Sequence, residues 1–432
     1  PTYRQGVTKM ENWIPAKSGA AVMRGGTEQV KSITDAFVAD HLIPLRGGES
    51  PMLGLYDSTN QKFRGLKAGV EEDSPTLPAS WSHNENVVWK LEVPGQGWSS
   101  PIVWDDLVVV TSAVSDDPGP GPQLGLYDGH SSSAIPTSIH RWIVYGIDLN
   151  NGQIRWEREV RSSSPPYASH GKHTYASETP VTDGEHVAVL VATGNLFLYD
   201  FDGELLWEVD LGPLDSGASY DDTYQWAAAS SPIIWEDLVI VQADQQEGSF
   251  IAAFDVGTGA EMWRTERDLI SSFSTPTVHV GAERTELITN GAGTMFGYDP
   301  ATGGELWRMS GSSFNTTPTP VVDRGLIYLT SGYRIRPIFA IRAGATGDIS
   351  LADGARSNEH VAWSSPREGP YMSSPLVYRG YLYVVAANGV LTVFEALTGE
   401  RAYKTRIAQR GGAYTASPIA ADGRIYLTSE DG

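Results

Sequence analysis

The sequence predicts an all-β fold, a β-propeller of four-stranded blades, and two recurring phrases carry that prediction. The first phrase is a small hydroxyl residue, then proline, then an apolar strand, and it occurs seven times. Three of the six intervals between these prolines are 43 or 44 residues long, about the length that four short strands with their turns need. The prolines are Pro101, Pro180, Pro232, Pro276, Pro320, Pro375 and Pro418.

Each unit is expected to open with an antiparallel hairpin. A tight turn such as Asp183-Gly184 or Arg379-Gly380 follows the first strand in most units. A run of β-branched and aromatic residues comes next, for example residues 382–385. Turn residues flanking such runs are typical of hairpins.

The second phrase, Asp-x-x-Thr-Gly-x-x-x-Trp, closes the units. Its carboxylate can accept hydrogen bonds from the turn, and its glycine can take a positive φ. Its tryptophan, on the outer strand, can bury a large ring against the neighbouring blade, so we expect these indoles to be largely buried. The predicted docking residues are Asp148, Trp156, Asp200, Trp207, Asp255, Trp263, Asp299 and Trp307.

Together these phrases resemble the tryptophan-docking repeats of PQQ-like β-propellers, the family of quinoprotein dehydrogenases and of the assembly lipoprotein BamB. The resemblance covers roughly residues 61–432, and the stretch from Phe63 to Pro101 resembles a secreted bacterial branch of the family. It implies a periplasmic or extracellular location. The fifth unit departs from the pattern, because residues 340–344 lack the aspartate and Trp363 arrives late.

Residues 1–60 do not fit the repeat and are expected to form an extension of uncertain fold. Residues Glu11-Asn12-Trp13-Ile14-Pro15 and Arg24-Gly25-Gly26-Thr27 resemble the opening of podophage tail nozzle proteins, over about 45 residues. That resemblance implies a phage tail component as an alternative function.

The propeller domain, residues 61–432, is expected to be incomplete at its C-terminus, because the seventh unit reaches only its second strand. The resemblance implies eight blades in a full-length chain. Residues 86–92, with Trp89, are expected to form an outer strand beside the first blade. Residues 417–428 are then expected to leave an open sheet edge.

Long insertions are expected on one face of the propeller, at residues 113–141, 157–176, 208–229 and 364–372, with tight turns on the opposite face. Long loops on a rigid scaffold are where binding usually resides. Their aromatic and charged residues suit a protein or glycan partner, although the same aromatics could instead pack the loops onto the propeller. The candidates are Tyr167, His170, His173, Tyr175, Asp221, Asp222, Tyr224, Trp226, Arg334, Arg336 and Tyr371.

The net charge of −21, from 52 acidic and 31 basic residues, argues against nucleic acid or an anionic membrane as a partner. No apolar run approaches the roughly 18 residues of a membrane span. The chain has no cysteine, which excludes thiolate chemistry and the cysteine-disulfide site found in many quinoprotein alcohol dehydrogenases.

Candidate chemistry is sparse. His170 and His173 could chelate a metal, but no third ligand is evident, so no metal site is predicted. The family resemblance implies PQQ with Ca²⁺ as an alternative, in an alcohol or sugar dehydrogenase. No cofactor is expected, and the favoured hypothesis is a non-catalytic scaffold that binds a protein or glycan through the long loops.

Overall fold

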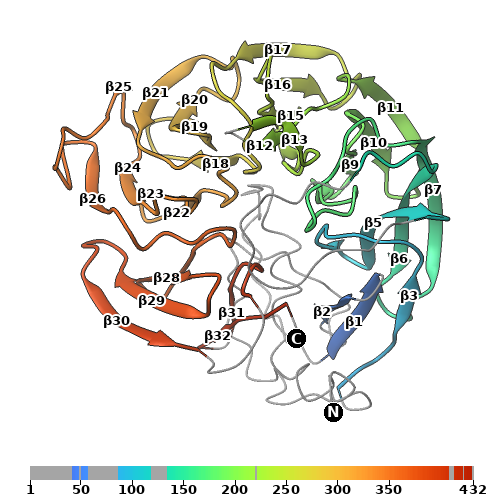
Figure 1. Ribbon diagram of the computed structural model, residues 1–432. Coiled ribbons are helices and arrows are strands. Elements are labelled where there is room, and N and C mark those ends of the chain that lie inside the picture. The colour runs from blue at the N-terminus through green and yellow to red at the C-terminus, as the bar shows by residue number, and fades with distance from the viewer. Residues whose placement is uncertain are drawn as a thin grey trace.

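The computed structural model describes the backbone of residues 41–47 and 50–56, and residues 86–117, 134–218, 221–407, 413–421 and 423–430. These residues form strands and connections with no helix, and the sheets radiate like blades around a common axis (Figure 1). Among them, therefore, no helix is long and apolar enough to cross a membrane. The prediction of a β-propeller with four-stranded antiparallel blades is confirmed.

The first three blades are regular four-stranded sheets whose strand order follows the sequence from the axis outward. A hairpin of β1 and β2 joins β3 through parallel pairing of β1 with β3. The bounds are β1(His41–Gly47), β2(Ser50–Tyr56), β3(Leu91–Val93), β4(Ile102–Trp104), β5(Leu107–Ser115), β6(His140–Asp148), β7(Ile154–Ser163), β8(Val181–Thr182), β9(His186–Leu190), β10(Asn195–Asp200), β11(Leu205–Asp210), β12(Gly217–Ala218), β13(Asp221–Gln225), β14(Ile233–Trp235), β15(Leu238–Ala243), β16(Phe250–Asp255) and β17(Glu261–Glu266).

The next blades repeat this plan, except that the fourth gains a fifth strand, β25, and the last described sheet is a hairpin of β31 and β32. Among the described residues, β32 pairs with β31 alone. The bounds are β18(Thr277–Val280), β19(Thr285–Asn290), β20(Thr294–Tyr298), β21(Glu305–Ser310), β22(Val321–Asp323), β23(Leu326–Thr330), β24(Ile338–Arg342), β25(Gly347–Asp348), β26(Val361–Ser365), β27(Leu376–Tyr378), β28(Tyr381–Val385), β29(Val390–Glu395), β30(Arg401–Arg406), β31(Ile419–Ala421) and β32(Arg424–Tyr426).

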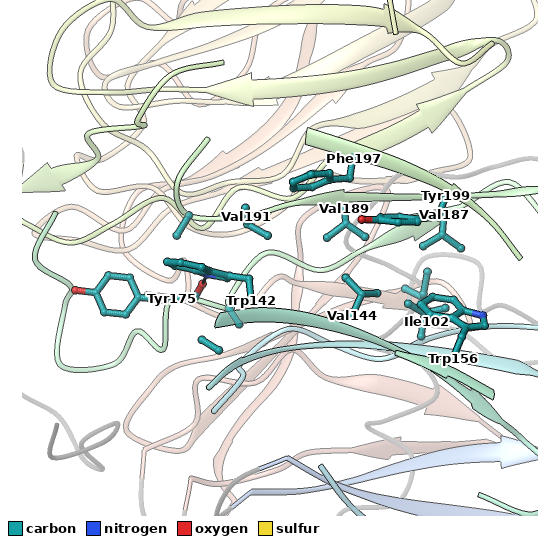
Figure 2. Packing of buried hydrophobic residues seen from close by; sticks show 14 of the residues in the cluster. Ile102, Trp142, Val144, Trp156, Tyr175, Val187, Val189, Val191, Phe197 and Tyr199 are labelled. Carbon is teal, nitrogen blue, oxygen red and sulfur yellow. Dashed lines mark hydrogen bonds between the residues drawn. The ribbon is translucent and has the colours of Figure 1, made fainter. Parts of the chain in front are cut away.

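The core lies between the blades. Figure 2 shows one such layer, in which Trp142 and Val144 of the first blade face Val189 and Phe197 of the second. In the second blade, for example, β9 and β10 are buried on both faces, whereas the outer strand β11 is mostly exposed apart from Trp207. Burial of apolar surface on both sides of every inner strand therefore holds neighbouring blades together.

Tryptophan docking joins successive blades as the phrase predicts. The indole N–H of one blade donates to the carbonyl directly after the acidic residue in the next blade's turn, as in Trp156 to Phe201 at 2.8 Å. The turn glycine lies flat against that indole at φ +75° in Gly203, where a Cβ would be 2.6 Å from the Trp156 ring. The same donation joins Trp89 to Leu149, Trp207 to Val256, Trp263 to Pro300 and Trp363 to Ala396.

Two docking expectations need correction. Trp263 is only partly buried, although its indole docks on the Pro300 carbonyl of the next blade. Trp307 is fully buried but does not dock on the next blade's turn. Its N–H donates instead to the buried Glu286 carboxylate at 2.8 Å, because the fifth unit lacks the acidic turn.

The fifth blade also overturns the expectation that every long insertion lies on one face. Its third and fourth strands, β24 and β26, are separated by residues 343–360, which lie on the opposite side. Part of this segment is β25, which pairs in parallel with the outer strand β21. Strand β7 also continues to Ser163, so the following loop starts later than expected.

The hydroxyl of the Ser/Thr-Pro phrase links the inner strands around the axis. In each link, a side-chain oxygen accepts a hydrogen bond from the matching backbone N–H of the preceding blade, at 2.9–3.1 Å. The proline that follows needs no partner for its nitrogen, which suits the first residue of a strand. The links join Ser100 to Thr179, Thr179 to Ser231, Ser231 to Thr275, Thr319 to Ser374 and Ser374 to Ser417.

Candidate functional site

The loop face is the end of the propeller that carries the blade-to-blade and second-to-third-strand connections. Among the described residues it comprises 164–180, 191–194, 211–218, 221–232, 244–249, 267–276, 291–294, 311–320, 331–337, 366–375, 386–389 and 413–418. Three of the long connections expected from the sequence belong to it. The fourth, within 113–141, is described only at residues 113–117 and 134–141.

The two long connections on either side of the second blade, residues 164–180 and 211–232, pack against each other. The backbone N–H of His170 donates to the Trp226 carbonyl at 3.3 Å, and the two rings meet edge to face at 5.1 Å. The His173 ring nitrogen Nε2 lies 2.8 Å from the Ala228 carbonyl. These contacts make the two connections one wall rather than two free loops.

Tyr175 anchors this wall on the first blade. Its hydroxyl donates to the Tyr167 carbonyl at 2.9 Å, and its own carbonyl accepts from the Trp142 indole at 2.6 Å. Figure 2 shows Tyr175 and Trp142 at one end of the apolar layer, with Trp156 at the other. The side chain of Tyr175 is buried, so it packs the loop onto the propeller.

The two histidines do not form a metal site with their neighbours. Burial lowers the pKa of both His170 and His173 to about 4, so both rings are neutral near pH 7. In His173, Nδ1 accepts from the Tyr175 N–H at 2.9 Å and Nε2 faces a carbonyl, so neither nitrogen is left for a metal. Across the described residues, no three His, Asp or Glu side chains converge as a metal site requires.

The second long loop contributes a short hairpin. Asp221 and Tyr224 lie on β13, which pairs with β12, and both are half-buried. The side chain of Asp222 lies outside the described residues. Trp226 is buried and lies 6.0 Å from the Phe273 ring, so it belongs to the packing between loops.

An exposed patch lies farther round the same face, over the fourth to sixth blades. Phe314 is 49% exposed and Ile335 is 51% exposed, and the flanking Arg334 and Arg336 are exposed as well. Tyr333 pairs with Phe314 through a backbone bridge. We call Phe314, Tyr333, Arg334, Ile335, Arg336, Arg367 and Tyr371 the Phe314 patch.

Close backbone packing holds the patch in place. The N–H of Gly369 donates to the Arg336 carbonyl at 2.8 Å, which joins the two connections that carry the patch. A Cβ on Gly332 would meet the Pro370 carbonyl oxygen at 2.1 Å, so only glycine permits this approach. The rings of Tyr333 and Tyr371 lie 6.1 Å apart.

The structure thus separates the sequence candidates into two groups. Arg334, Arg336 and Tyr371 come together in the patch, whereas the first two loops form the packed wall. Phe314, Tyr333, Ile335 and Arg367 were not identified from the sequence. An aromatic residue inside the polar connection Gly311–Pro318 was the available signal for Phe314.

A cleft of about 490 Å³ lies on the same face, between the third and fourth blades. Glu247 and Asp268 contribute carboxylates to its lining, and Ala292 and Thr294 form its border with the fourth blade. The turn at residues 291–294 lies between this cleft and the Phe314 patch. The Gly293 N–H donates to the Ser313 carbonyl at 3.3 Å, which ties the turn to the connection that carries Phe314.

A buried ion pair supports the cleft. Arg267 and Asp244 have fully buried side chains joined by a contact of 2.7 Å. Thr289 and Tyr298 accept further hydrogen bonds from the guanidinium, at 2.9 and 2.8 Å, and Ser272 donates to the carboxylate at 2.5 Å. Every charge is compensated, so this network orders the third and fourth blades and offers no free acid or base.

PQQ with Ca²⁺ requires donors that converge on the ion. The described residues hold no group of three carboxylates or histidines that converge in this way.

Comparison with known proteins identifies a matching family and several similar structures. A family model described as outer membrane protein assembly factor BamB matches residues 140–344 and 355–432. BamB from Moraxella catarrhalis is 16% identical over 76% of this chain and 89% of that chain, with a TM-score of 0.43. Quinohemoprotein alcohol dehydrogenase from Comamonas testosteroni is 13% identical over 77% and 70%, with a TM-score of 0.38. No curated protein sequence matches.

Proposed function

Because the chain belongs to the PQQ-like propeller family described as outer membrane protein assembly factor BamB, we propose that it is a scaffold that binds a partner protein. The loop face is the proposed binding surface, and the Phe314 patch is its proposed main contact. The family also supports a periplasmic or extracellular location for this activity. No catalytic step is proposed.

The observation that carries the proposal is the exposure of Phe314 and Ile335 beside arginines. Aromatic and arginine side chains are enriched at the energetic centres of protein interfaces, where they fill pockets on the partner. A glycan partner would be contacted mainly through polar groups and flat aromatic rings, whereas Ile335 offers an aliphatic surface. A protein partner therefore fits the patch better than a glycan.

Site-specific photocrosslinking in the native host tests the proposal. A benzoyl-phenylalanine at position 314 is expected to give a discrete protein adduct. The same residue at position 381, an exposed tyrosine beside the tight turn at 379–380, is the matched control on the opposite face. Ile335→Asp is expected to abolish the adduct at 314, and identical adducts from both positions would refute the loop face as the binding surface.

A further inference from the structure

The Phe314 patch gathers three exposed arginines on a chain with an acidic net charge. The chain carries a net charge of −21, yet residues 311–318 and 331–337 contain no acidic residue. Arg334, Arg336 and Arg367 are exposed there. The nearest acid in the sequence, Glu368, is directed to other cations, because it pairs with Arg401 and Lys404 at 3.1 Å each.

Apolar groups lie among these cations. Phe314 and Ile335 expose about half of their surfaces, and the Arg334 guanidinium lies 5.3 Å from the Tyr333 ring. A ligand that follows this surface meets positive charge and apolar side chains in alternation.

The cations are positioned before any ligand arrives. Arg334 has φ +64°, the left-handed conformation that residues other than glycine rarely adopt. The backbone on either side is fixed, since the Ile335 N–H donates to the Tyr333 carbonyl at 2.8 Å and Arg336 accepts from Gly369. Such preorganisation lowers the entropy that binding must overcome.

Resting on the proposed function, we propose that the patch recognises an acidic segment of the partner protein in which carboxylates flank an aromatic or aliphatic side chain. Complementary charge accelerates and orients association, and the apolar side chain supplies surface to bury. A basic segment would be repelled at the patch. A long polyanion such as nucleic acid would meet the negative remainder of the surface.

A direct binding measurement tests this inference without the natural partner. The probe is a fluorescein-labelled peptide of Glu-Glu-Phe repeats, with Lys-Lys-Phe and Ser-Ser-Phe repeats as comparisons, followed by fluorescence anisotropy. We expect the acidic peptide alone to bind, and to bind more weakly when NaCl rises from about 50 to about 300 mM, since added salt screens the attraction.

Two triple variants locate the binding. The triple variant Arg334→Ala/Arg336→Ala/Arg367→Ala is expected to bind the acidic peptide with an affinity lower by on the order of tenfold or more. The matched control is Arg324→Ala/Arg379→Ala/Arg424→Ala, which removes three exposed arginines from the tight-turn face. It is expected to leave affinity almost unchanged. Unfolding curves of both variants check that each remains folded.

Equal weakening in both triple variants would overturn the inference, because the attraction would then be general. Preference for the lysine peptide, or tight binding of single-stranded DNA through the same arginines, would also overturn it. So would failure of the acidic peptide to bind. If crosslinking at position 314 still captures a partner in that case, the proposed function stands while the acidic segment is refuted.

Discussion

Glu178 occupies a repeat position, two residues before the proline, that a buried serine holds in four other units: Ser99, Ser230, Ser274 and Ser373. Neither oxygen of its carboxyl group has a hydrogen-bond partner among the described residues. The space beside it is too narrow for a water molecule. Burial therefore raises its pKa to about 8, although nearby backbone N–H groups act in the opposite direction.

Glu178→Gln is expected to change how stability depends on pH. In the unfolded chain this acid ionises near its ordinary pKa, whereas in the folded chain it keeps its proton up to about pH 8. The wild-type protein therefore loses stability as pH rises toward 8, by up to about 1.4 kcal/mol per pH unit. The glutamine variant should lack that slope in urea unfolding between pH 6.5 and 8.

The comparison with wild type isolates Glu178, because His170 and His173, neutral in both folded proteins with pKa values of about 4, also titrate alike in both unfolded chains, so their contribution to the slope cancels. Glu185→Gln, which removes an exposed carboxylate from the same blade, serves as the control. Parallel curves for wild type and Glu178→Gln would show that the buried carboxyl group ionises normally.

For single residues, the sequence predicts which loops carry aromatic side chains better than it predicts whether each side chain binds a partner or packs against the propeller. His173 and Trp226 look like binding residues, because aromatic side chains in loops serve either recognition or packing. Their partners decide between the two roles, and the Ala228 carbonyl that His173 contacts lies 55 residues along the chain. Arg334 and Arg336 were identifiable as exposed because arginines flanking a turn rarely become buried.

At the scale of the blade, docking was predictable because its phrase is local. The acid, the glycine and the tryptophan lie within nine residues. One short segment therefore specifies both a turn and the indole ring that docks on the turn of the next blade. The series of hydroxyl links was not predictable. Thr179 and Ser231 are separated by 52 residues, and only the packing of the second blade beside the third brings them together.

Trp156→Ala is expected to cost about 3–5 kcal/mol in unfolding free energy, the usual cost of truncating a buried aromatic side chain. The loss includes the hydrogen bond to Phe201 and the contact with Gly203. Chemical unfolding followed by circular dichroism measures it. Tyr403 is the matched control, because it holds the same repeat position on β30 but is 48% exposed.

Tyr403→Ala should therefore cost less than about 1 kcal/mol, the range of surface substitutions. Comparable losses in the two variants would mean that docking on the next turn contributes little.

The fifth blade shows where the repeat fails as a guide. Without an acidic turn, its connection at residues 343–360 instead reaches back to the fourth blade. The Gly344 N–H and the Trp307 indole both donate to Glu286, which replaces the missing turn carbonyl. A late Trp363 indicated an insertion in this unit, but not that β25 would cover the edge of β21. Covering an outer edge in this way also protects it from pairing with other chains.

At the scale of the whole molecule, the loop face ties distant parts of the chain together. Lys172, in the connection after the first blade, lies 2.5 Å from the Glu430 carboxylate, which follows the last hairpin. The two side chains are 12% and 7% exposed, and Thr415 donates to the same oxygen at 3.0 Å. This contact joins residues that are 258 positions apart.

Lys172→Met is expected to loosen both segments at once. Removing one partner of a largely buried ion pair leaves an uncompensated charge and typically costs about 3–5 kcal/mol. Hydrogen exchange should quicken in residues 164–180 and in 413–430 together. Residues 238–255, in the inner strands of the third blade, should keep their protection. Adding Glu430→Gln removes the stranded charge, so the double variant should recover part of the loss. Exchange that quickens in one segment alone would show that the pair does not couple the first connection to the last hairpin.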